Sequence, residues 1–271
     1  MSALPSVLHI WNLTGGSSLI DRYYKKLYGG TGTVIARKDF DTFGFTRYYG
    51  GTAYGGGAAT FTLRAVLKSY RYDIVQVHAV DRYVPLMKRV HPLGKPVVLQ
   101  YHGHDVLGRW EEKRPRWSKA DYLTYSTPDM APGAPESAHY VRDMVDTEFF
   151  RPAGVERVSN SAFTFSYNMD DEARAVASKM GLQLTIFKRL SIPMDEMPKV
   201  FSSHEFFFDM RKRTGEDEPV KCIGTGAFQA LACGCKVVDW EGKVHHEFPP
   251  EHSPEKVMDG WVRVYRELAG S

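Results

Sequence analysis

Short, almost continuously apolar runs alternate with helical segments along the sequence, and this alternation restricts the fold more than any other feature. In the first half, runs rich in β-branched residues lie at 7–11, 33–36, 73–78, 96–101 and 122–126, with helical segments near 19–27, 61–70 and 83–90. Such runs are typical of parallel strands that helices cover on both faces. The first half therefore predicts a doubly wound α/β domain, whose ligands bind beyond the carboxyl ends of the strands.

A proline-rich stretch at 127–135 and a linker at 145–152 interrupt this pattern before a second alternating set begins. The last helix has a clear start, with Ser253 as N-cap and Pro254 as first residue. We therefore expect a second α/β domain and a boundary between 1–145 and 146–271. Its strands are predicted near 162–165, 184–187, 206–208 and 237–238, and its helices near 171–180, 196–202 and 225–233.

Composition and charge narrow the function classes. Of the 271 residues, 43% are apolar and 25% are charged, which is typical of a globular protein. The formal net charge of +3 is too small to indicate nucleic acid as a partner. No apolar run approaches the roughly 20 residues of a membrane-spanning helix, and no secretory signal is recognisable, so we expect a cytoplasmic protein.

The chain has three cysteines, Cys222, Cys233 and Cys235. An odd number without a secretory signal indicates a reducing compartment. The spacing of Cys233 and Cys235 does not suit a zinc knuckle, and Cys233 falls inside an apolar helical segment. We expect small buried thiols rather than metal ligands.

The segment GTGAFQALACG, residues 224–234, predicts a glycine turn, a short helix and a glycine stop before a buried strand. Gly224 and Gly226 lack the Cβ atoms that would keep a ligand away from the backbone. The first N–H groups of the helix attract phosphate. We therefore predict a phosphate site at Gly224, Thr225 and Gly226, although an ordinary loop before a core helix is the alternative for so short a motif.

Several motifs, taken together and in this order, resemble the retaining, nucleotide-sugar-dependent glycosyltransferases of the GT-B fold, of the family 4 type. The resemblance implies two Rossmann-like doubly wound domains facing each other across a cleft, the first on the acceptor side and the second on the donor side. The matching segments are the Gly15-Gly16 loop, DIVQVHA at 73–79, KPVVLQYHGHD at 95–105, VDTEFFRP at 145–152, MDEMPKVF at 194–201 and the segment 224–238.

The resemblance implies transfer of a sugar from a UDP- or GDP-sugar to a glycan, lipid or protein acceptor, with retention. It implies no bound metal and no cofactor beyond the donor. His102 would act at the donor sugar, although a structural loop histidine is the alternative; for His78 we weigh structure and function equally. The implied site residues are His102 as the catalytic group and, around the donor nucleotide, Gly15, Gly16, Lys188, Arg189, Gly224, Thr225, Gly226 and Gln229.

The chain departs from the family at two positions of the donor motif. Two glutamates of that motif contact the sugar and the ribose hydroxyls, and here Lys221 and Gln229 stand in their places. Gln229 can still hydrogen-bond a ribose, but Lys221 has no acceptor. Glu216 or Glu218 could take the vacant role. The alternative function is therefore a weakened relative that binds nucleotide or glycan without turnover.

Two further segments have alternative interpretations. The glycine–aromatic loop at 48–57 suits stacking against a sugar, or is a loop without a ligand. The basic and aromatic run at 109–117 suits peripheral contact with an anionic membrane surface, or forms a solvated face.

Overall fold

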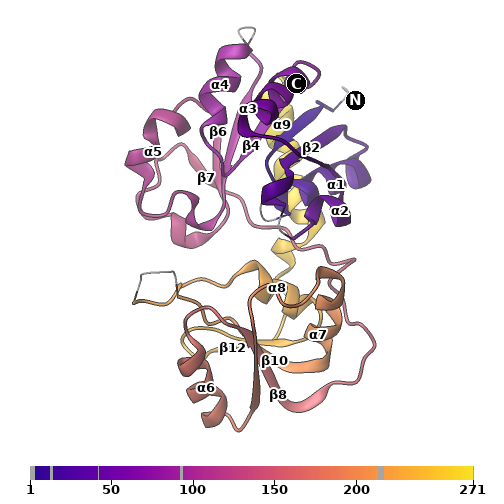
Figure 1. Cartoon of the computed structure of the whole chain (residues 1–271), viewed down its shortest axis with the longest axis vertical. Helices are drawn as coiled ribbons and strands as arrows, with labels where there is room; N and C mark the ends of the chain where they lie inside the picture. Colours follow the sequence, from indigo (N-terminus) through magenta and orange to yellow (C-terminus); the bar gives the residue numbers. More distant parts are fainter. Residues whose placement is uncertain (1–3, 13–14, 42, 92–93, 213–216, 271) are drawn as a thin grey trace. The chain divides into compact units, whose positions relative to one another are not determined.

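The computed structural model describes the chain except for residues 1–3, 13–14, 42, 92–93, 213–216, 271 and the side chain of His104. It divides into two compact units (Figure 1), the first made of 1–144 with 254–271 and the second of 145–253. The division near 145 agrees with the linker that the sequence predicts. The C-terminal segment 254–271 is a correction, because it was expected in the second domain and belongs to the first.

The first unit contains a parallel sheet in the order β3-β2-β1-β4-β5-β6-β7. Consecutive strands run outward from β1 to β3, and the chain then returns to place β4 beside β1. The strand order therefore reverses between β1 and β4. The strands are β1 (Val7–Ile10), β2 (Gly32–Arg37), β3 (Thr52–Tyr54), β4 (Ile74–His78), β5 (Val97–Tyr101), β6 (Tyr122–Tyr125) and β7 (Ala138–Tyr140).

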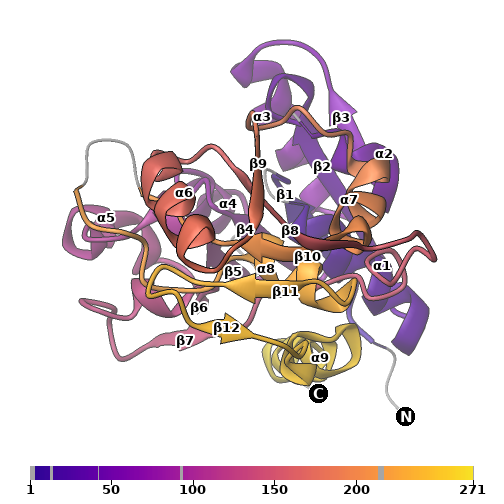
Figure 2. The ribbon, with the colours of Figure 1, turned by 90° about the horizontal axis from the view of Figure 1, so that it is seen from below.

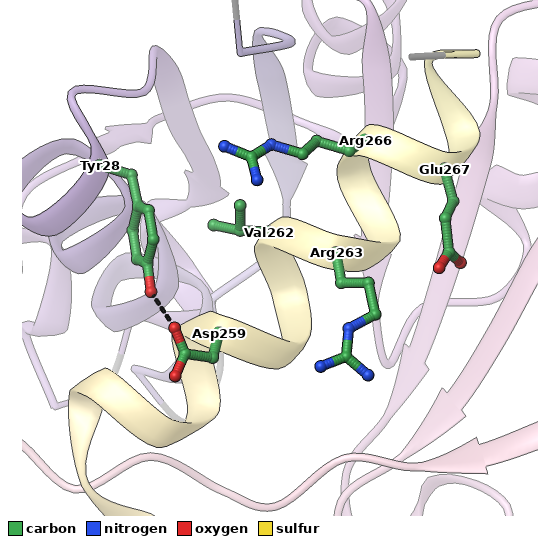
Figure 3. Close-up of a pocket in the computed structure, with 6 residues that line it drawn as sticks. All are labelled: Tyr28, Asp259, Val262, Arg263, Arg266 and Glu267. Carbon is green, nitrogen blue, oxygen red and sulfur yellow. Dashed lines mark hydrogen bonds between the residues drawn. The ribbon is translucent and has the colours of Figure 1, made fainter. Parts of the chain in front are cut away.

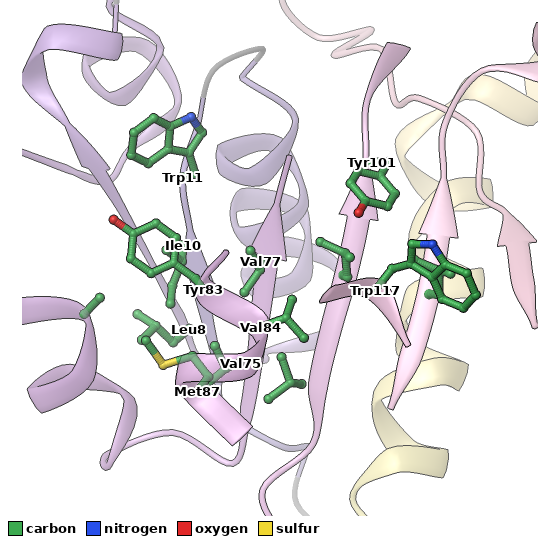
Figure 4. Packing of buried hydrophobic residues seen from close by; sticks show 14 of the residues in the cluster. Leu8, Ile10, Trp11, Val75, Val77, Tyr83, Val84, Met87, Tyr101 and Trp117 are labelled. Carbon is green, nitrogen blue, oxygen red and sulfur yellow. The ribbon is translucent and has the colours of Figure 1, made fainter. Parts of the chain in front are cut away.

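One face of this sheet packs against α3, α4 and α5, where Leu8, Ile10, Val75 and Val77 form the centre of a large apolar core (Figure 4). Burial of the apolar and aromatic side chains of this core is the main stabilising contribution to the first unit. The helices of the first unit are α1 (Gly16–Tyr28), α2 (Phe45–Tyr49), α3 (Ala58–Ser69), α4 (Tyr83–Val90), α5 (Trp110–Trp117) and α9 (Pro254–Leu268), with 3₁₀ turns η1 (Lys38–Phe40), η2 (Gly103–Asp105) and η3 (Pro128–Met130).

The C-terminal helix α9 lies beside α1 in the first unit (Figure 1). Tyr265 of α9 packs edge-on against Tyr24 of α1, with 5.3 Å between the ring centroids. The Tyr265 hydroxyl donates a hydrogen bond to the side-chain oxygen of Gln76 in β4 at 2.5 Å. The side-chain amide of Gln76 in turn donates to the side-chain oxygen of Gln100 in β5 at 3.0 Å. These buried contacts explain why the helix belongs to this unit.

The second unit contains a sheet in the order β12-β11-β10-β8-β9, parallel except for β12 (Figure 2). Its apolar residues form one cluster with α6 and another with α7 and α8, so helices cover both faces. The strands are β8 (Val158–Phe165), β9 (Gln183–Phe187), β10 (His204–Phe208), β11 (Lys236–Val238) and β12 (Val244–His245). The helices are α6 (Asp170–Lys179), α7 (Met197–Ser203) and α8 (Thr225–Ala232), with η4 (Met194–Glu196) and η5 (Pro250–His252).

The predicted strands and helices are confirmed, and the structure adds elements in segments to which the sequence analysis assigned no strand or helix. The glycine–aromatic loop contains the edge strand β3, preceded by Gly50 and Gly51, which both have positive φ. The basic–aromatic run forms α5, and its Trp110 and Trp117 are buried in the core. Those indole rings are therefore not exposed to contact a membrane surface.

Candidate functional site

In the second unit the strand order reverses between β8 and β10, and ligands bind at such a reversal in open α/β sheets. The segment after β8 contains Tyr167, and β10 is followed at once by Asp209 and then Arg211. The chain returns from β10 to α8, which begins at Thr225 after Gly224. The carboxyl ends of the two central strands and the start of α8 thus define the first part of the candidate site.

Asp209 and Arg211 are fixed to the start of α8. The Asp209 carboxylate accepts a hydrogen bond from the Gly224 backbone N–H at 2.7 Å and pairs with Arg211 Nε at 2.7 Å. Arg211 also donates to the carbonyl oxygen of Cys222 at 2.7 Å. A Cβ atom on Gly224 would lie 2.8 Å from the guanidinium carbon of Arg211. Gly224 therefore allows a cation to lie against the beginning of the helix.

A second arginine lies in the same region. Burial alone would lower the pKa of Arg211, but the charge and hydrogen bond of Asp209, together with Cys222 and Tyr167, outweigh this effect and raise the pKa, so the guanidinium stays charged. Tyr167 also acts on the pKa of Arg211, and the Arg189 guanidinium lies 5.3 Å from the centre of the Tyr167 ring. Arginines beside a helix N-terminus provide an environment that favours phosphate oxygens.

The predicted residues of this region differ in their surroundings. Lys188 is exposed at the end of β9, whereas Arg189 packs over Tyr167. Gly226 lies in the first turn of α8, where an added Cβ would meet no atom within 4 Å. Gln229 is half-buried one turn further along, and Thr225 is the first helical residue.

Asp209 and Arg211 were not identified from the sequence. The signal for them is their position directly after a buried run of three phenylalanines, Phe206, Phe207 and Phe208. The sequence analysis instead assigned Lys188 and Arg189, which follow the strand predicted near 184–187, to the donor nucleotide. In the structure Arg211 follows β10, which lies on the other side of β8 from β9.

Lys221, which replaces a family glutamate, lies on the surface. Its ammonium group pairs with the Glu218 carboxylate at 2.9 Å, and both side chains are largely exposed. Glu218, one of the two predicted substitutes for the missing carboxylate, is therefore engaged with Lys221. Glu216, the other, lies outside the described residues.

In the first unit, His102 follows β5 and takes part in a chain of three histidines. His9 Nδ1 lies 3.1 Å from His78 Nε2, and His78 Nδ1 lies 3.2 Å from His102 Nε2. His9 and His78 are buried, whereas the side chain of His102 is 9% exposed. The chain thus leads from the interior of the sheet to its carboxyl edge, where His102 was predicted to act.

Strand register explains this arrangement. His9 of β1 is paired with Gln76 of β4, so His78 lies two residues further along the neighbouring strand. His78 is paired with Gln100 of β5, so His102 again lies two residues further along. Residues two apart share a face of a sheet, and diagonal neighbours are within reach of imidazole rings.

The outer edge of His102 faces polar groups. Its Nδ1 lies 3.5 Å from the Ser126 hydroxyl oxygen and 3.8 Å from the Asp143 carboxylate. Asp105 caps the following turn, because its carboxylate accepts a hydrogen bond from the His102 backbone N–H at 2.8 Å. Asp105 therefore holds the turn that follows His102.

Two non-glycine residues with left-handed backbone conformation follow the central strands of the first unit. Trp11 (φ 83) follows β1 and Ala79 (φ 63) follows β4. Conformations of this kind are uncommon for such residues and cluster at functional sites. Both lie at the carboxyl ends of β1 and β4, where the strand order reverses.

The predicted phosphate role of Gly15 and Gly16 has a competing structural explanation. Gly15 has a φ of 80° and precedes α1, and an added Cβ would lie 2.8 Å from the Phe45 ring. Gly16 is the first residue of α1. The Asn12 side-chain oxygen already accepts hydrogen bonds from the Ser17 hydroxyl at 2.5 Å and the Ser18 backbone N–H at 3.3 Å. One backbone N–H of this helix start is therefore already bonded to a side chain of the protein.

A surface cavity of about 360 Å³ lies between α1 and α9 (Figure 3). Tyr28, at the end of α1, donates a hydrogen bond to Asp259, and Arg263, Arg266 and Glu267 complete the polar lining. Burial and Asp259 raise the pKa of Tyr28 to about 12. Because α1 ends where the chain turns into the start of β2, this cavity lies away from the carboxyl ends of the strands.

All three cysteines are buried, as predicted, and burial raises the pKa of Cys233 and Cys235 to about 12. Within the described ranges, no three His, Cys, Asp or Glu side chains are grouped so as to hold a metal ion. No helix in the part of the chain that is described has the length and apolar character needed to cross a bilayer.

No protein-family model matches the chain, and no curated protein matches its sequence. Solved structures do match. Anabaena HepE in complex with UDP and glucose has a TM-score of 0.54 at 13% identity, over 87% of this chain and 80% of that one. UDP-GlcNAc 2-epimerase from Neisseria meningitidis, bound to UDP-GlcNAc, has a TM-score of 0.52 at 10% identity, over 97% and 94%.

AviGT4, a glycosyltransferase involved in avilamycin A biosynthesis, has a TM-score of 0.52 at 15% identity, over 98% of this chain and 93% of that one. At these identities the likeness concerns the fold. Together with the two parallel-dominant α/β sheets, it establishes that the chain consists of two Rossmann-like domains of the GT-B fold.

Proposed function

We propose that the protein is a glycosyltransferase that uses a nucleotide-diphosphate sugar, UDP- or GDP-linked, as its donor. The second unit binds the nucleotide diphosphate, and the first unit supplies His102. Transfer proceeds with retention and without a bound metal, as the resemblance to family 4 implies. The acceptor is a glycan, a lipid or a protein.

The observation that carries this proposal is the position of Arg211 against Gly224 at the start of α8. A departing nucleoside diphosphate needs positive charge and N–H donors where its negative charge develops. Arg211 and Arg189 provide the charge, and the first turn of α8 provides N–H groups beside the open space at Gly226. Fold likeness to proteins solved with UDP or UDP-GlcNAc supports the same ligand class.

Thermal unfolding with UDP, GDP and a panel of their sugars tests the nucleotide part. A ligand at 100 times its Kd stabilises the native state by about 2.7 kcal/mol, which is readily measured. Gly226→Val should abolish the shift in a folded protein, because the new side chain fills the open space over the first turn. Calorimetry that shows unchanged affinity in Gly226→Val would exclude the diphosphate from this turn.

Release of UDP or GDP from the donor tests the chemistry. We expect slow hydrolysis of at least one sugar nucleotide, which His102→Ala reduces. His139→Ala is a matched control, since His139 is exposed on β7 and packs on Tyr122 rather than joining the histidine chain. Conversion of the donor into an epimer without release of nucleotide would instead assign an epimerase reaction.

The second candidate function is a protein that binds nucleotide or glycan without turnover. It is favoured by Lys221, which replaces a glutamate with a cation and pairs with Glu218 on the surface. Clear stabilisation by a nucleotide, with no hydrolysis across the donor panel, would favour this candidate over the enzyme.

A further inference from the structure

The three histidines form a continuous polar row inside an otherwise apolar sheet. The ring centroids of His9 and His78 are 5.4 Å apart with the rings inclined by 34°, and those of His78 and His102 are 5.5 Å apart with the rings inclined by 19°. Each contact brings two ring nitrogens to hydrogen-bond distance. Each therefore requires one nitrogen to carry a proton and the other to be bare.

The inner members of this row are neutral at ordinary pH. Burial lowers the pKa of His9 to about 4, with Asp21 opposing and Lys25 adding to the effect. Burial lowers the pKa of His78 well below its ordinary value, and the positive charge that His9 and His102 carry when protonated lowers this pKa further. A neutral imidazole carries a single N–H, on one nitrogen or the other.

While all three rings are neutral, only two arrangements satisfy both contacts. If His78 carries its proton on Nδ1, it donates to His102 Nε2, and its bare Nε2 accepts from His9 Nδ1. All three protons then lie on Nδ1. If His78 carries its proton on Nε2, the same reasoning places all three protons on Nε2.

The two ends of the row distinguish these arrangements. His9 Nε2 is buried and has no hydrogen-bond partner in the described part of the chain. The Nε2 arrangement would leave an N–H there without an acceptor, and orphaned buried N–H groups are rare. At the other end, His102 Nδ1 faces the Asp143 carboxylate and the Ser126 hydroxyl oxygen, which can both accept. The structure therefore favours three Nδ1–H tautomers.

We infer that His9 and His78 are positioning residues that hold His102 in the Nδ1–H tautomer, so that His102 presents a hydrogen-bond donor at its exposed edge. For the role in catalysis, this rests on the function proposed above. Ser126 and Asp143, at 3.5 and 3.8 Å from Nδ1, are beyond an ordinary hydrogen-bond distance, so the Nδ1–H of His102 donates instead to an oxygen of a bound sugar or phosphate, and His102 does not act as a general base. The charged groups near the row are Asp21 and Lys25 of α1 at the inner end and Asp105 and Asp143 at the outer end.

Nitrogen-15 NMR of the protein labelled at histidine measures the tautomers directly, because protonated and bare ring nitrogens have different chemical shifts. In the wild-type protein at pH 7.5 we expect Nδ1–H at His9, His78 and His102, assigned by single substitution of each. An Nε2–H tautomer at His102 in the wild-type spectrum would overturn the inference without any need for a variant.

Two substitutions of His78 separate positioning from packing. The Asn side chain of His78→Asn places an amide N–H near the position of Nδ1, so His102 should remain Nδ1–H. His78→Leu removes the donor, and His102 should become a mixture of tautomers. Thermal unfolding confirms that each variant is folded. An unchanged His102 tautomer in folded His78→Leu would contradict the inference.

Donor hydrolysis by the same variants tests the catalytic role. We expect a loss of roughly tenfold in His78→Leu, corresponding to about one hydrogen bond to the reacting group, and nearly wild-type turnover in His78→Asn. Equal losses in both variants would overturn the positioning role. If the wild-type protein hydrolyses no donor, the proposed function fails, while the NMR spectra still decide the tautomer.

Discussion

Acidification should selectively weaken the first unit, because His9 and His78 are buried as neutral rings. The pKa of His9 falls from 6.5 to about 4 on folding. Since the folded-state pKa is the lower one, the unfolded chain takes up the proton first as the pH decreases. The stability contribution is therefore fully present above about pH 6.5 and is lost as the pH falls towards 4.

The size of the effect follows from these two pKa values. Each unit of pKa difference corresponds to about 1.4 kcal/mol, so His9 alone contributes about 2 kcal/mol less at pH 5 than at pH 8. His78 acts in the same direction. The sum is a large fraction of the 5–15 kcal/mol that typically stabilises a domain.

Urea unfolding followed by tryptophan fluorescence measures this effect. Four of the five tryptophans, Trp11, Trp110, Trp117 and Trp261, are buried in the first unit, so fluorescence mainly reports its unfolding. Because other groups also titrate, the decisive quantity is the difference between pH 8 and pH 5 in wild type and in His9→Leu. We expect that difference to be about 2 kcal/mol smaller in the variant.

His139→Leu is the control for the loss of an imidazole elsewhere in the first unit, because His139 is exposed on β7 and lies outside the histidine row. If wild type and His9→Leu lose the same stability between pH 8 and pH 5, the ring of His9 is not buried in the neutral form. The account of the histidine row would then be wrong.

Two further predictions concern single contacts. Gly224→Ala should destabilise the second unit by about 1–3 kcal/mol and weaken UDP or GDP binding, because its Cβ would overlap Arg211. Gly226→Ala should leave the stability nearly unchanged, and urea unfolding with calorimetry measures both variants. Tyr265→Phe should lower the urea stability of the first unit by about 1–3 kcal/mol, because it leaves buried Gln76 without a donor. Unchanged stability in Tyr265→Phe would show that this bond does not hold α9.

Much of the fold follows from the sequence, because the strands are continuous apolar runs and the helices have regular periodicity. The position of α9 does not. Its apolar face, with Trp261 and Tyr265 one turn apart, is evident from the sequence, but an apolar face can cover any exposed sheet. What selects the first unit is the side-chain contact from Tyr265 to Gln76, and no local pattern reveals a contact between residues so distant in sequence.

For the site, the sequence predicts which residues follow the strand ends better than it predicts which side chains those residues contact. His102 and Arg189 lie after the strands that were predicted to precede them. Arg211 was not predicted because it follows β10. That strand pairs with β8, and the pairing depends on strand order rather than on adjacency in the chain. Glycine at position 224 was read as space for a ligand, whereas the structure places the Arg211 side chain there.

The histidine row does have a signal in the sequence. Fully buried parallel strands are usually apolar at every position, yet Gln76, His78, Gln100 and His102 fall at alternate positions of two such runs, and His9 interrupts a third. Alternation places polar residues on one face, and parallel pairing makes them neighbours. Burying polar groups is costly unless they are hydrogen-bonded, and apolar residues would fill the same volume without that requirement. A row that is satisfied at every inner contact and ends at the carboxyl edge is therefore better explained by what it does to His102 than by packing of the sheet.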